Sequence, residues 1–399
     1  MILTTANELI LVSSLRAFRG PNGGLVLTQK YLDGAAAFER AWPGPVTTLA
    51  RMSSTPSLDM DQVEVMPRDC QTRIEIYPEH ETDLKERLSD AAAVLALLSP
   101  NEADLAEMCH KIGVPIVFYS EYSPRTERQI VDANTRNPVL RWRRKLWIRG
   151  AEKTRQKILR DHASALQCNG TPTYDLYSKT LPKAILYFDN RVREKDVIDD
   201  LSLAEKQTAI AKGEPLRLVY GGRFVAMKGV LELVRVAKEL NGLKVPYSLD
   251  IYGAGPLEDR LRHLISQGNL TDKVTIRPGM DFLTGWVPLL KREADIFLCC
   301  HLQGDPSSTY TEVMSCGVPI AGYDNEAFAG VHQVSKVGWT VPMRDAKALA
   351  KVIAELHQDR EAIGEMAIQG RDFARQHCFE PTFAKRIAQI ISASRLPQT

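Results

Sequence analysis

The sequence lacks any uninterrupted apolar stretch long enough to cross a membrane, although 44% of its residues are hydrophobic. A membrane-spanning helix needs about 20 consecutive, mostly apolar residues, so we expect none here. Residues 1–7 also lack the basic start and the apolar segment of a secretory signal peptide. These two absences predict a cytoplasmic protein, which would meet a membrane only at its surface.

The chain also has few cysteines, and their spacing forms no pairs of the zinc type. The count of seven is odd, and Cys168, Cys299 and Cys300 fall in strand-like runs. We therefore expect reduced, buried thiols, as in proteins of a reducing compartment. Because no cluster of His and Asp residues suggests metal ligands, we expect neither a metal nor another cofactor.

There is almost no excess charge of either sign, since 51 Lys and Arg residues face 49 Asp and Glu residues. A formal net charge of +2 excludes a general attraction to nucleic acid, so any basic function must be local. The most basic segment, 139–160, includes Trp142 and Trp147. As a helix, it suits contact with anionic lipid headgroups. The alternative is a solvated helix whose tryptophans pack on their own domain.

A chain of 399 residues can bury two cores of similar size. Short apolar runs alternate with amphipathic runs in both halves, which predicts parallel sheets covered by helices. The polar stretch 189–215 interrupts this alternation, so we predict domains at 1–192 and 193–378. The first helix is expected over 25–42. The expected strands are 8–13, 46–50, 73–77, 92–98, 115–119, 163–168, 184–188, 216–220, 248–252, 274–277, 296–300, 319–323 and 338–341.

One stretch, 300–319, joins an apolar strand through turn residues and a short helix to a second apolar strand. In open α/β sheets, a loop at the carboxyl end of a strand holds anions, because free amides and the helix dipole point there. The segment 304–309 is therefore a candidate ligand-binding loop. Glu312, one turn into the helix, can direct its carboxylate at hydroxyl groups beside the anion.

Two cations, Arg223 and Lys228, lie in a glycine-bordered loop after another strand of the same sheet. A guanidinium and an ammonium together suit a diphosphate, whose charge grows as the bond to its leaving oxygen breaks. Each cation alone would be interpreted as a solvated surface charge. Gly23 and Gly24, at the start of the first expected helix, would let a ligand approach the backbone or would form an ordinary turn.

Together these segments resemble the retaining nucleotide-sugar glycosyltransferases of GT-B architecture, a family that includes sucrose synthases and bacterial lipid and polysaccharide glycosyltransferases. The resemblance is strong in the second half and loose in the first, through Gly23-Gly24 and Asn190. It implies an α/β fold with two Rossmann-like domains facing across a cleft, and a last helix within 379–399 that crosses back to the first domain. The matching motifs are Gly221-Gly222-Arg223-Phe224, Met227-Lys228-Gly229, Gly253-Ala254-Gly255-Pro256 and Glu312-Val313-Met314-Ser315-Cys316-Gly317-Val318-Pro319, which is similar to the family's E-A-M-A-C-G-x-P.

The resemblance also implies roles for individual residues. Arg223 and Lys228 would hold the donor diphosphate, and Glu312 would accept hydrogen bonds from the ribose hydroxyls. Gly23 and Gly24 would close over the phosphates from the other domain. The remaining residues implied in donor binding are Gly222, Gly253, Gly255, Arg277, Pro278, Ser308, Thr309 and Tyr310.

Two positions depart from the family pattern. The family's second glutamate, eight positions before Glu312, is Gly304 here; either the neighbouring Asp305 takes its catalytic role or the donor sugar has a different hydroxyl pattern. A histidine that commonly follows a strand of the first domain is replaced by Glu121, which either takes over a catalytic role or is an ordinary exposed glutamate.

The function implied is metal-independent transfer of a sugar, with retained configuration, from a nucleotide-diphosphate donor. The acceptor would be a sugar, a lipid-linked chain or a growing polysaccharide at the inner face of the cytoplasmic membrane. Nucleic acid is not an expected partner, because no second basic cluster extends the segment 139–160. Two alternatives remain: a nucleotide-sugar epimerase on the same plan, and a non-catalytic partner that binds sugar nucleotides.

Overall fold

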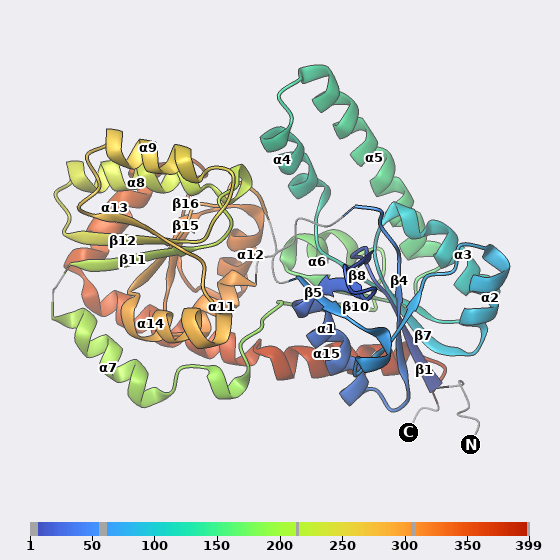
Figure 1. Cartoon of the computed structure of the whole chain (residues 1–399). Coiled ribbons are helices and arrows are strands. Elements are labelled where there is room, and N and C mark those ends of the chain that lie inside the picture. Colours follow the sequence, from blue (N-terminus) through green and yellow to red (C-terminus); the bar gives the residue numbers. More distant parts are fainter. Residues whose placement is uncertain (1–6, 56–61, 213–214, 305–307, 397–399) are drawn as a thin grey trace.

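The computed structural model describes residues 7–55, 62–212, 215–304 and 308–396. Two parallel sheets stand side by side, each covered by helices on both faces (Figure 1). The first sheet has the strand order β10-β9-β8-β7-β1-β4-β6, and the second has the order β13-β12-β11-β14-β15-β16. The expected α/β fold is confirmed. Within the described residues, no helix combines the length and the apolar character needed to span a bilayer.

The first sheet is formed by seven parallel strands that alternate with helices along the chain. Every residue of β1 and β4 is buried, because helices cover both faces of the sheet. The strands are β1 (Glu8–Val12), β4 (Val46–Ala50), β6 (Arg73–Ile76), β7 (Ala91–Leu97), β8 (Ile116–Ser120), β9 (Ala165–Asn169) and β10 (Ala184–Tyr187). The helices that accompany them are α1 (Gln29–Ala41), α2 (Glu81–Ser89), α3 (Ala103–Lys111) and α6 (Thr171–Tyr177).

The expectation of a helix from residue 25 is wrong at its start. Leu25–Thr28 is strand β3, which pairs antiparallel with β2 (Phe18–Arg19) and β5 (Gln62–Val65) in a small separate sheet. The run Leu-Val-Leu is short and apolar, so its pattern does not distinguish a helical turn from a buried strand. Helix α1 begins only at Gln29, where the Thr28 side chain accepts a hydrogen bond from the Tyr31 amide at 3.3 Å.

A helical hairpin, α4 (Pro124–Asn134) and α5 (Pro138–Asp161), projects from the first domain (Figure 1). Along α5, side chains are buried only from residue 148 onward. Its buried residues are Ile148, Ala151, Arg155, Ile158 and Leu159. The amino-terminal half of α5 therefore extends beyond the body of the domain.

The second sheet and its helices form the largest hydrophobic core, which includes the fully buried side chains of Tyr220, Phe224 and Phe297. Its strands are β11 (Leu216–Gly221), β12 (Tyr247–Tyr252), β13 (Val274–Arg277), β14 (Ile296–Cys299), β15 (Ile320–Tyr323) and β16 (Trp339–Val341). Its helices are α7 (Asp200–Ala211), α8 (Val230–Gly242), α9 (Glu258–Gln267), α10 (Val287–Glu293), α11 (Thr309–Ser315), α12 (Glu326–Ser335), α13 (Ala346–Gln358) and α14 (Arg360–Gln376).

The last helix, α15 (Phe379–Ala393), follows α14 after two intervening residues and runs back to pack against the first sheet (Figure 1). The Phe383 ring lies 4.6 Å from that of Phe38, measured between centroids. Arg386 Nε donates to Gln167 Oε1 at 2.8 Å, and Gln167 Nε2 donates to the Arg386 carbonyl at 2.9 Å. The expected crossing of the last helix back to the first domain is confirmed.

Candidate functional site

Two loops meet at the carboxyl edge of the second sheet. The first loop, 221–229, follows β11, and the second loop, which begins at Cys300, follows the neighbouring strand β14. The Leu302 amide donates to the Met227 carbonyl at 2.9 Å. Gly229 has a φ of +63°, and a Cβ there would lie 1.8 Å from the Cys300 carbonyl oxygen. Glycine is therefore required where the two loops touch.

The first loop carries both predicted cations. Lys228 ends a 3-10 turn, Ala226–Lys228, and its side chain is buried, whereas Arg223 is exposed. Between them, the fully buried Phe224 anchors the loop, because its amide donates to the Ala254 carbonyl at 2.8 Å. The loop is thus held at its centre, with one cation on each side.

The predicted donor-binding glycines Gly222, Gly253 and Gly255 are needed for backbone packing. A Cβ on Gly253 would lie 2.0 Å from the Gly222 carbonyl oxygen, and a Cβ on Gly255 would lie 2.8 Å from the Phe224 carbonyl oxygen. All three have positive φ values between 140° and 157°. The glycines let the loop after β12 press against the first loop, which fixes the backbone that carries Arg223.

Glu312, on the first turn of α11, is buried and already has a partner. Arg191 Nε donates to Glu312 Oε1 at 2.7 Å, and Arg191 Nη2 donates to Glu312 Oε2 at 3.4 Å. The Arg191 guanidinium also lies 3.9 Å from the centroid of the Phe282 ring. Sequence reasoning missed Arg191, since it lies 121 residues from Glu312 and belongs to no motif. Its only signal was its position beside Asn190, in the polar stretch.

A second ion pair, Lys30–Asp189, lies close to this one, with 2.7 Å between Lys30 Nζ and Asp189 Oδ2. Attraction to Asp189 raises the pKa of Lys30 above its ordinary value, because it outweighs the lowering by burial, and Glu312 adds a smaller increase. Burial raises the pKa of Asp189, but the Lys30 ammonium, together with Arg386 and Arg191, brings that pKa below its ordinary value. Lys30 and Asp189 were likewise not anticipated from the sequence.

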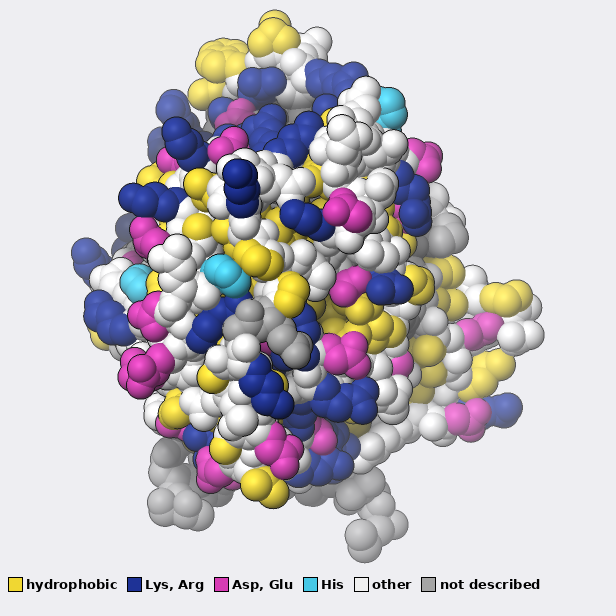
Figure 2. Space-filling view, turned by 90° about the vertical axis from the view of Figure 1, so that its left-hand side faces the viewer, with side chains coloured by type: hydrophobic (Ala, Val, Ile, Leu, Met, Phe, Trp, Pro, Cys, Tyr) yellow, Lys and Arg dark blue, Asp and Glu magenta, His cyan; other side chains and the backbone are white. Residues whose placement is uncertain are grey.

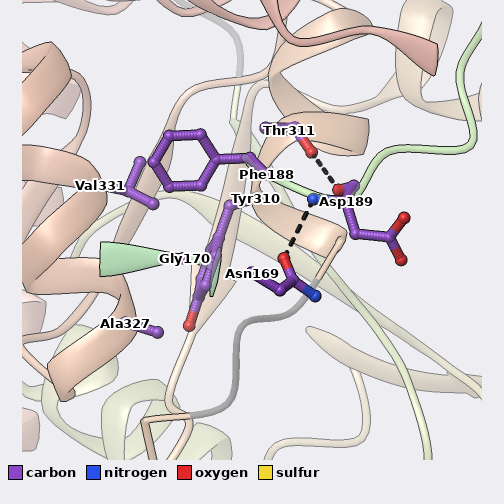
Figure 3. A pocket seen from close by; sticks show the side chains of 8 residues that line it. All are labelled: Asn169, Gly170, Phe188, Asp189, Tyr310, Thr311, Ala327 and Val331. Carbon is purple, nitrogen blue, oxygen red and sulfur yellow. Dashed lines mark hydrogen bonds between the residues drawn. The ribbon is translucent and has the colours of Figure 1, made fainter. Parts of the chain in front are cut away.

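The domains also meet around a small cavity of about 10 Å³ (Figure 3). The Asp189 amide donates to Asn169 Oδ1 at 3.2 Å, and Thr311 Oγ1 donates to the Asp189 carbonyl at 2.9 Å. The remaining walls are Gly170, Phe188, Tyr310, Ala327 and Val331. Such a volume holds about one water molecule, so this cavity is part of the domain contact and cannot hold a sugar.

Helix α4 of the first domain covers the second loop. Thr126 Oγ1 donates to the Gly304 carbonyl at 2.8 Å, and the Gly304 amide donates to Gln129 Oε1 at 2.9 Å. Ser123 Oγ donates to Glu326 Oε2 at 2.6 Å. A Cβ on Gly304 would lie 2.7 Å from Glu326 Cβ and 2.8 Å from Thr126 Oγ1. The position where the family has a glutamate is therefore occupied by a contact between the domains.

The predicted residues that would reach the site from the first domain lie on two of its loops. Glu121, directly after β8, is half-buried, and its charge adds to the effect of burial in raising the pKa of Tyr119. Gly23 is exposed in a turn, and the amide of Gly24 donates to Glu64 Oε1 at 2.9 Å. Because Glu64 also accepts from the amide of Asn22 at 3.0 Å, a carboxylate of this chain already occupies the turn.

The other predicted residues lie around the two loops. Arg277 and Pro278 are exposed at the end of β13, where Arg277 Nε pairs with Asp250 at 2.9 Å. Ser308 and Thr309 begin α11, but the Tyr310 side chain is buried and stacks on another ring at 5.3 Å between centroids. Asp305 lies outside the described residues. Within the described residues, no group of three His, Cys, Asp or Glu side chains is placed to hold a metal ion.

The sequence of residues 203–373 matches the family described as Glycosyl transferases group 1. The chain is 26% identical over 199 residues to the putative colanic acid biosynthesis glycosyltransferase WcaL of Salmonella typhimurium, a match that covers 48% of each chain. It is 27% identical over 192 residues to the amylovoran biosynthesis glycosyltransferase AmsK of Erwinia amylovora, covering 45% of each. A GDP-mannose-dependent alpha-(1-6)-phosphatidylinositol monomannoside mannosyltransferase of Mycobacterium tuberculosis is 26% identical over 200 residues, covering 48% of this chain and 51% of the relative. The chain thus spans about half the length of the curated relatives it matches.

Solved structures resemble the whole chain. HepE from Anabaena, in complex with UDP, superposes with a TM-score of 0.66 and 12% identity, covering 97% of this chain and 100% of HepE. Sucrose-phosphate synthase from Thermosynechococcus elongatus has a TM-score of 0.61 and 16% identity, covering 97% and 98%. These likenesses show that the fold is GT-B. Residues 203–373 are therefore similar to the glycosyl transferases of group 1, and the fold that carries them is GT-B over nearly the whole chain.

Proposed function

We propose that the protein is a retaining glycosyltransferase that moves a sugar from a nucleotide-diphosphate donor to an acceptor in polysaccharide or glycolipid assembly. One observation carries the proposal. The loop with Arg223 and Lys228 and the helix with Glu312 follow neighbouring strands of one sheet, and the Met227–Leu302 hydrogen bond of 2.9 Å joins their backbones. The two cations suit the diphosphate of a nucleotide, and the carboxylate suits its ribose hydroxyls.

The two cations would act on the leaving group. As the bond between the sugar and the diphosphate breaks, negative charge grows on the departing oxygen. Lys228 is buried, so its ammonium acts in a medium of lower dielectric than water, where a charge interaction is stronger. Arg223, exposed at the other end of the loop, would hold the phosphates by its planar fork.

Glu312 would bind the ribose hydroxyls while Arg191 holds its carboxylate in place. Each carboxylate oxygen has two acceptor sites, so the bonds from Arg191 leave capacity for two hydroxyl donors. Arg191 is then a positioning residue, because it acts on the donor through Glu312. These two roles would account for the pairing of the buried Glu312 carboxylate with the partly exposed Arg191 guanidinium beside the loop.

Retention would follow from attack by the acceptor on the same face of the sugar that the diphosphate leaves. We assign no protein nucleophile. Asp305, next to Gly304, would contact the donor sugar in place of the family's glutamate, and Glu121 would face the reaction from the first sheet. Gly23 and Gly24 would approach the phosphates only after the amides of Asn22 and Gly24 exchange Glu64 for the ligand.

For the acceptor we propose a lipid-linked or polysaccharide chain at the cytoplasmic face of the membrane. The similar proteins named above are assigned to colanic acid and amylovoran biosynthesis and to a phosphatidylinositol mannoside, which motivates this choice. All seven cysteines are free, which fits a reducing compartment. The donor is less constrained, since HepE was solved with UDP whereas the mannosyltransferase relative is GDP-mannose-dependent.

Donor turnover tests the proposal. The purified protein is incubated with UDP-glucose and GDP-mannose, each with and without sugar and lipid-linked acceptors. Free nucleoside diphosphate together with a new glycoside supports the transferase. An isomerised sugar nucleotide would indicate an epimerase, and binding without turnover would indicate a non-catalytic partner. In a transferase, Lys228→Ala removes turnover, while Lys351→Ala, on the exposed face of α13, serves as the matched control.

A further inference from the structure

The projecting half of α5 exposes an unusual concentration of large apolar side chains. Trp142 is 62% exposed and Trp147 is 61% exposed, so neither packs on its own domain. This excludes the interpretation of 139–160 as a solvated helix with buried tryptophans. The three other exposed hydrophobic residues of the segment are Val139, Leu140 and Leu146.

These side chains lie on the side of α5 that faces away from α4. Val139, Trp142 and Leu146 follow the spacing i, i+3, i+7, which places them on one side of a helix. The opposite side is bound to α4 and to the turn after it. Lys145 Nζ lies 2.7 Å from Asp132, and Arg141 Nη2 donates to the Thr135 carbonyl at 3.0 Å.

The same segment concentrates positive charge. Helix α5 contains nine Lys and Arg residues but only two Glu and Asp residues, in a chain whose formal net charge is +2. One of the two acids, Glu152, is engaged by the Tyr177 hydroxyl at 2.8 Å and by Arg155 at 3.5 Å. Figure 2 shows hydrophobic side chains gathered at the top of the molecule, where the hairpin projects, with Lys and Arg side chains around and below them.

We propose that the hairpin tip, residues 138–149, docks on a lipid bilayer with anionic headgroups. Trp142 and Trp147 enter the interface, where indole rings are favoured, and Arg143 and Arg149 meet the lipid phosphates. The charge argues for a membrane over a second copy of this chain, because a self-complementary contact would place these cations against one another.

Docking has a consequence for the site. Helix α4 begins at the contact with Gly304 and ends, 11 residues later, beside the tip. At 1.5 Å per residue, α4 spans roughly 16 Å, so it would separate the second loop from the docked tip by at most about that distance. A lipid-linked acceptor could extend its sugar across this gap. This consequence rests on the proposed function, whereas docking itself does not.

Sedimentation with vesicles tests the docking without any sugar nucleotide, so its outcome is independent of turnover. The full chain is mixed with vesicles of phosphatidylcholine, with or without phosphatidylglycerol, at low and high salt. We expect pelleting with phosphatidylglycerol at low salt and its loss at high salt. Trp142→Ala with Trp147→Ala, and separately Arg143→Glu with Arg149→Glu, weaken binding roughly tenfold or more.

The matched control for the charge reversal is Lys347→Glu with Lys351→Glu on α13, in the other domain and away from the hairpin. For the tryptophans it is Leu201→Ala, a 71% exposed residue of α7. Both controls should pellet like the unchanged protein. The proposal is overturned if the protein fails to pellet with phosphatidylglycerol at low salt, or if the tip variants pellet unchanged. It is equally overturned if the tryptophan variant dissociates a dimer and still pellets with vesicles, which would assign the tip to contact with a second copy.

Discussion

At the scale of single residues, the site depends on pairs that bring distant parts of the chain together. Arg191 reaches Glu312, and Thr126 reaches Gly304, across 121 and 178 positions. Sequence reasoning singled out Glu312 and Gly304, because they belong to or depart from a motif. It could not find their partners, since a single arginine or threonine outside any motif has no periodicity or spacing that signals a long-range contact.

Removing the partner of Glu312 should weaken donor binding more than turnover. In Arg191→Ala the carboxylate loses two charge-assisted hydrogen bonds and its fixed orientation, so we expect KM for the donor to rise about tenfold while kcat changes less. Steady-state kinetics over a donor series measure both constants. Arg262→Ala, which breaks an exposed pair with Glu258 on α9, is the control and should leave both unchanged. A fall in kcat alone would contradict a positioning role.

Gly304 should not tolerate even one added methyl group. Because a Cβ there meets Glu326 and Thr126 at less than 3 Å, Gly304→Ala should destabilise the protein by about 1–3 kcal/mol. Gly150→Ala is the matched control: nothing lies within 4 Å of a Cβ there, and alanine in this helix should stabilise by up to about 1 kcal/mol. Urea unfolding measures both free energies. Equal free energies of unfolding for the two variants would show that Gly304 is not tightly packed against Glu326 and Thr126.

At the scale of elements, apolar runs predicted the strands of both large sheets, because a strand buried on both faces has little choice of residue type. The small sheet of β2, β3 and β5 was missed. Its strands are two to four residues long, and β3 pairs with β5 across a long stretch of chain, so no local pattern separates β3 from a helix start. Helix α12 was also missed, although its cap Asn325 accepts from the Ala327 amide at 3.2 Å.

The junction between α14 and α15 should make stability depend on pH through His377. Its ring lies among Phe188 and Phe373, at 5.0 and 4.6 Å between centroids, and burial with the nearby Lys385 lowers its pKa from 6.5 to about 4. Between pH 6.5 and pH 4, His377 is therefore protonated in the unfolded chain but stays neutral in the folded chain. Stability should be full above pH 6.5 and fall by about 2–3 kcal/mol as the pH drops to 4.

Replacing the imidazole separates this effect from other acid-sensitive groups. His377→Phe cannot be protonated, so its free energy of unfolding should fall less between pH 6.5 and pH 4 than that of the unchanged protein. Urea unfolding at several pH values gives the two slopes. Parallel slopes would assign the acid sensitivity to other residues.

At the scale of the whole molecule, the two domains contribute different parts of one site. The second domain supplies the cations and Glu312, the stretch between β10 and α7 supplies Arg191, and the first domain places α4 over the loop that contains Gly304. The architecture was predictable, because the order of the matching motifs and the alternation of elements point to one fold. The seating of α4 on Gly304 was not, since it depends on how two separately folded sheets meet.

The most direct test of the central claim is a crystal structure of the protein soaked with UDP or GDP. The account predicts that the diphosphate lies between the first loop and α11, within hydrogen-bonding distance of Lys228 Nζ and the Arg223 guanidinium, with the ribose hydroxyls on Glu312. A diphosphate bound elsewhere, with Lys228 and Glu312 both remote from it, would contradict the account.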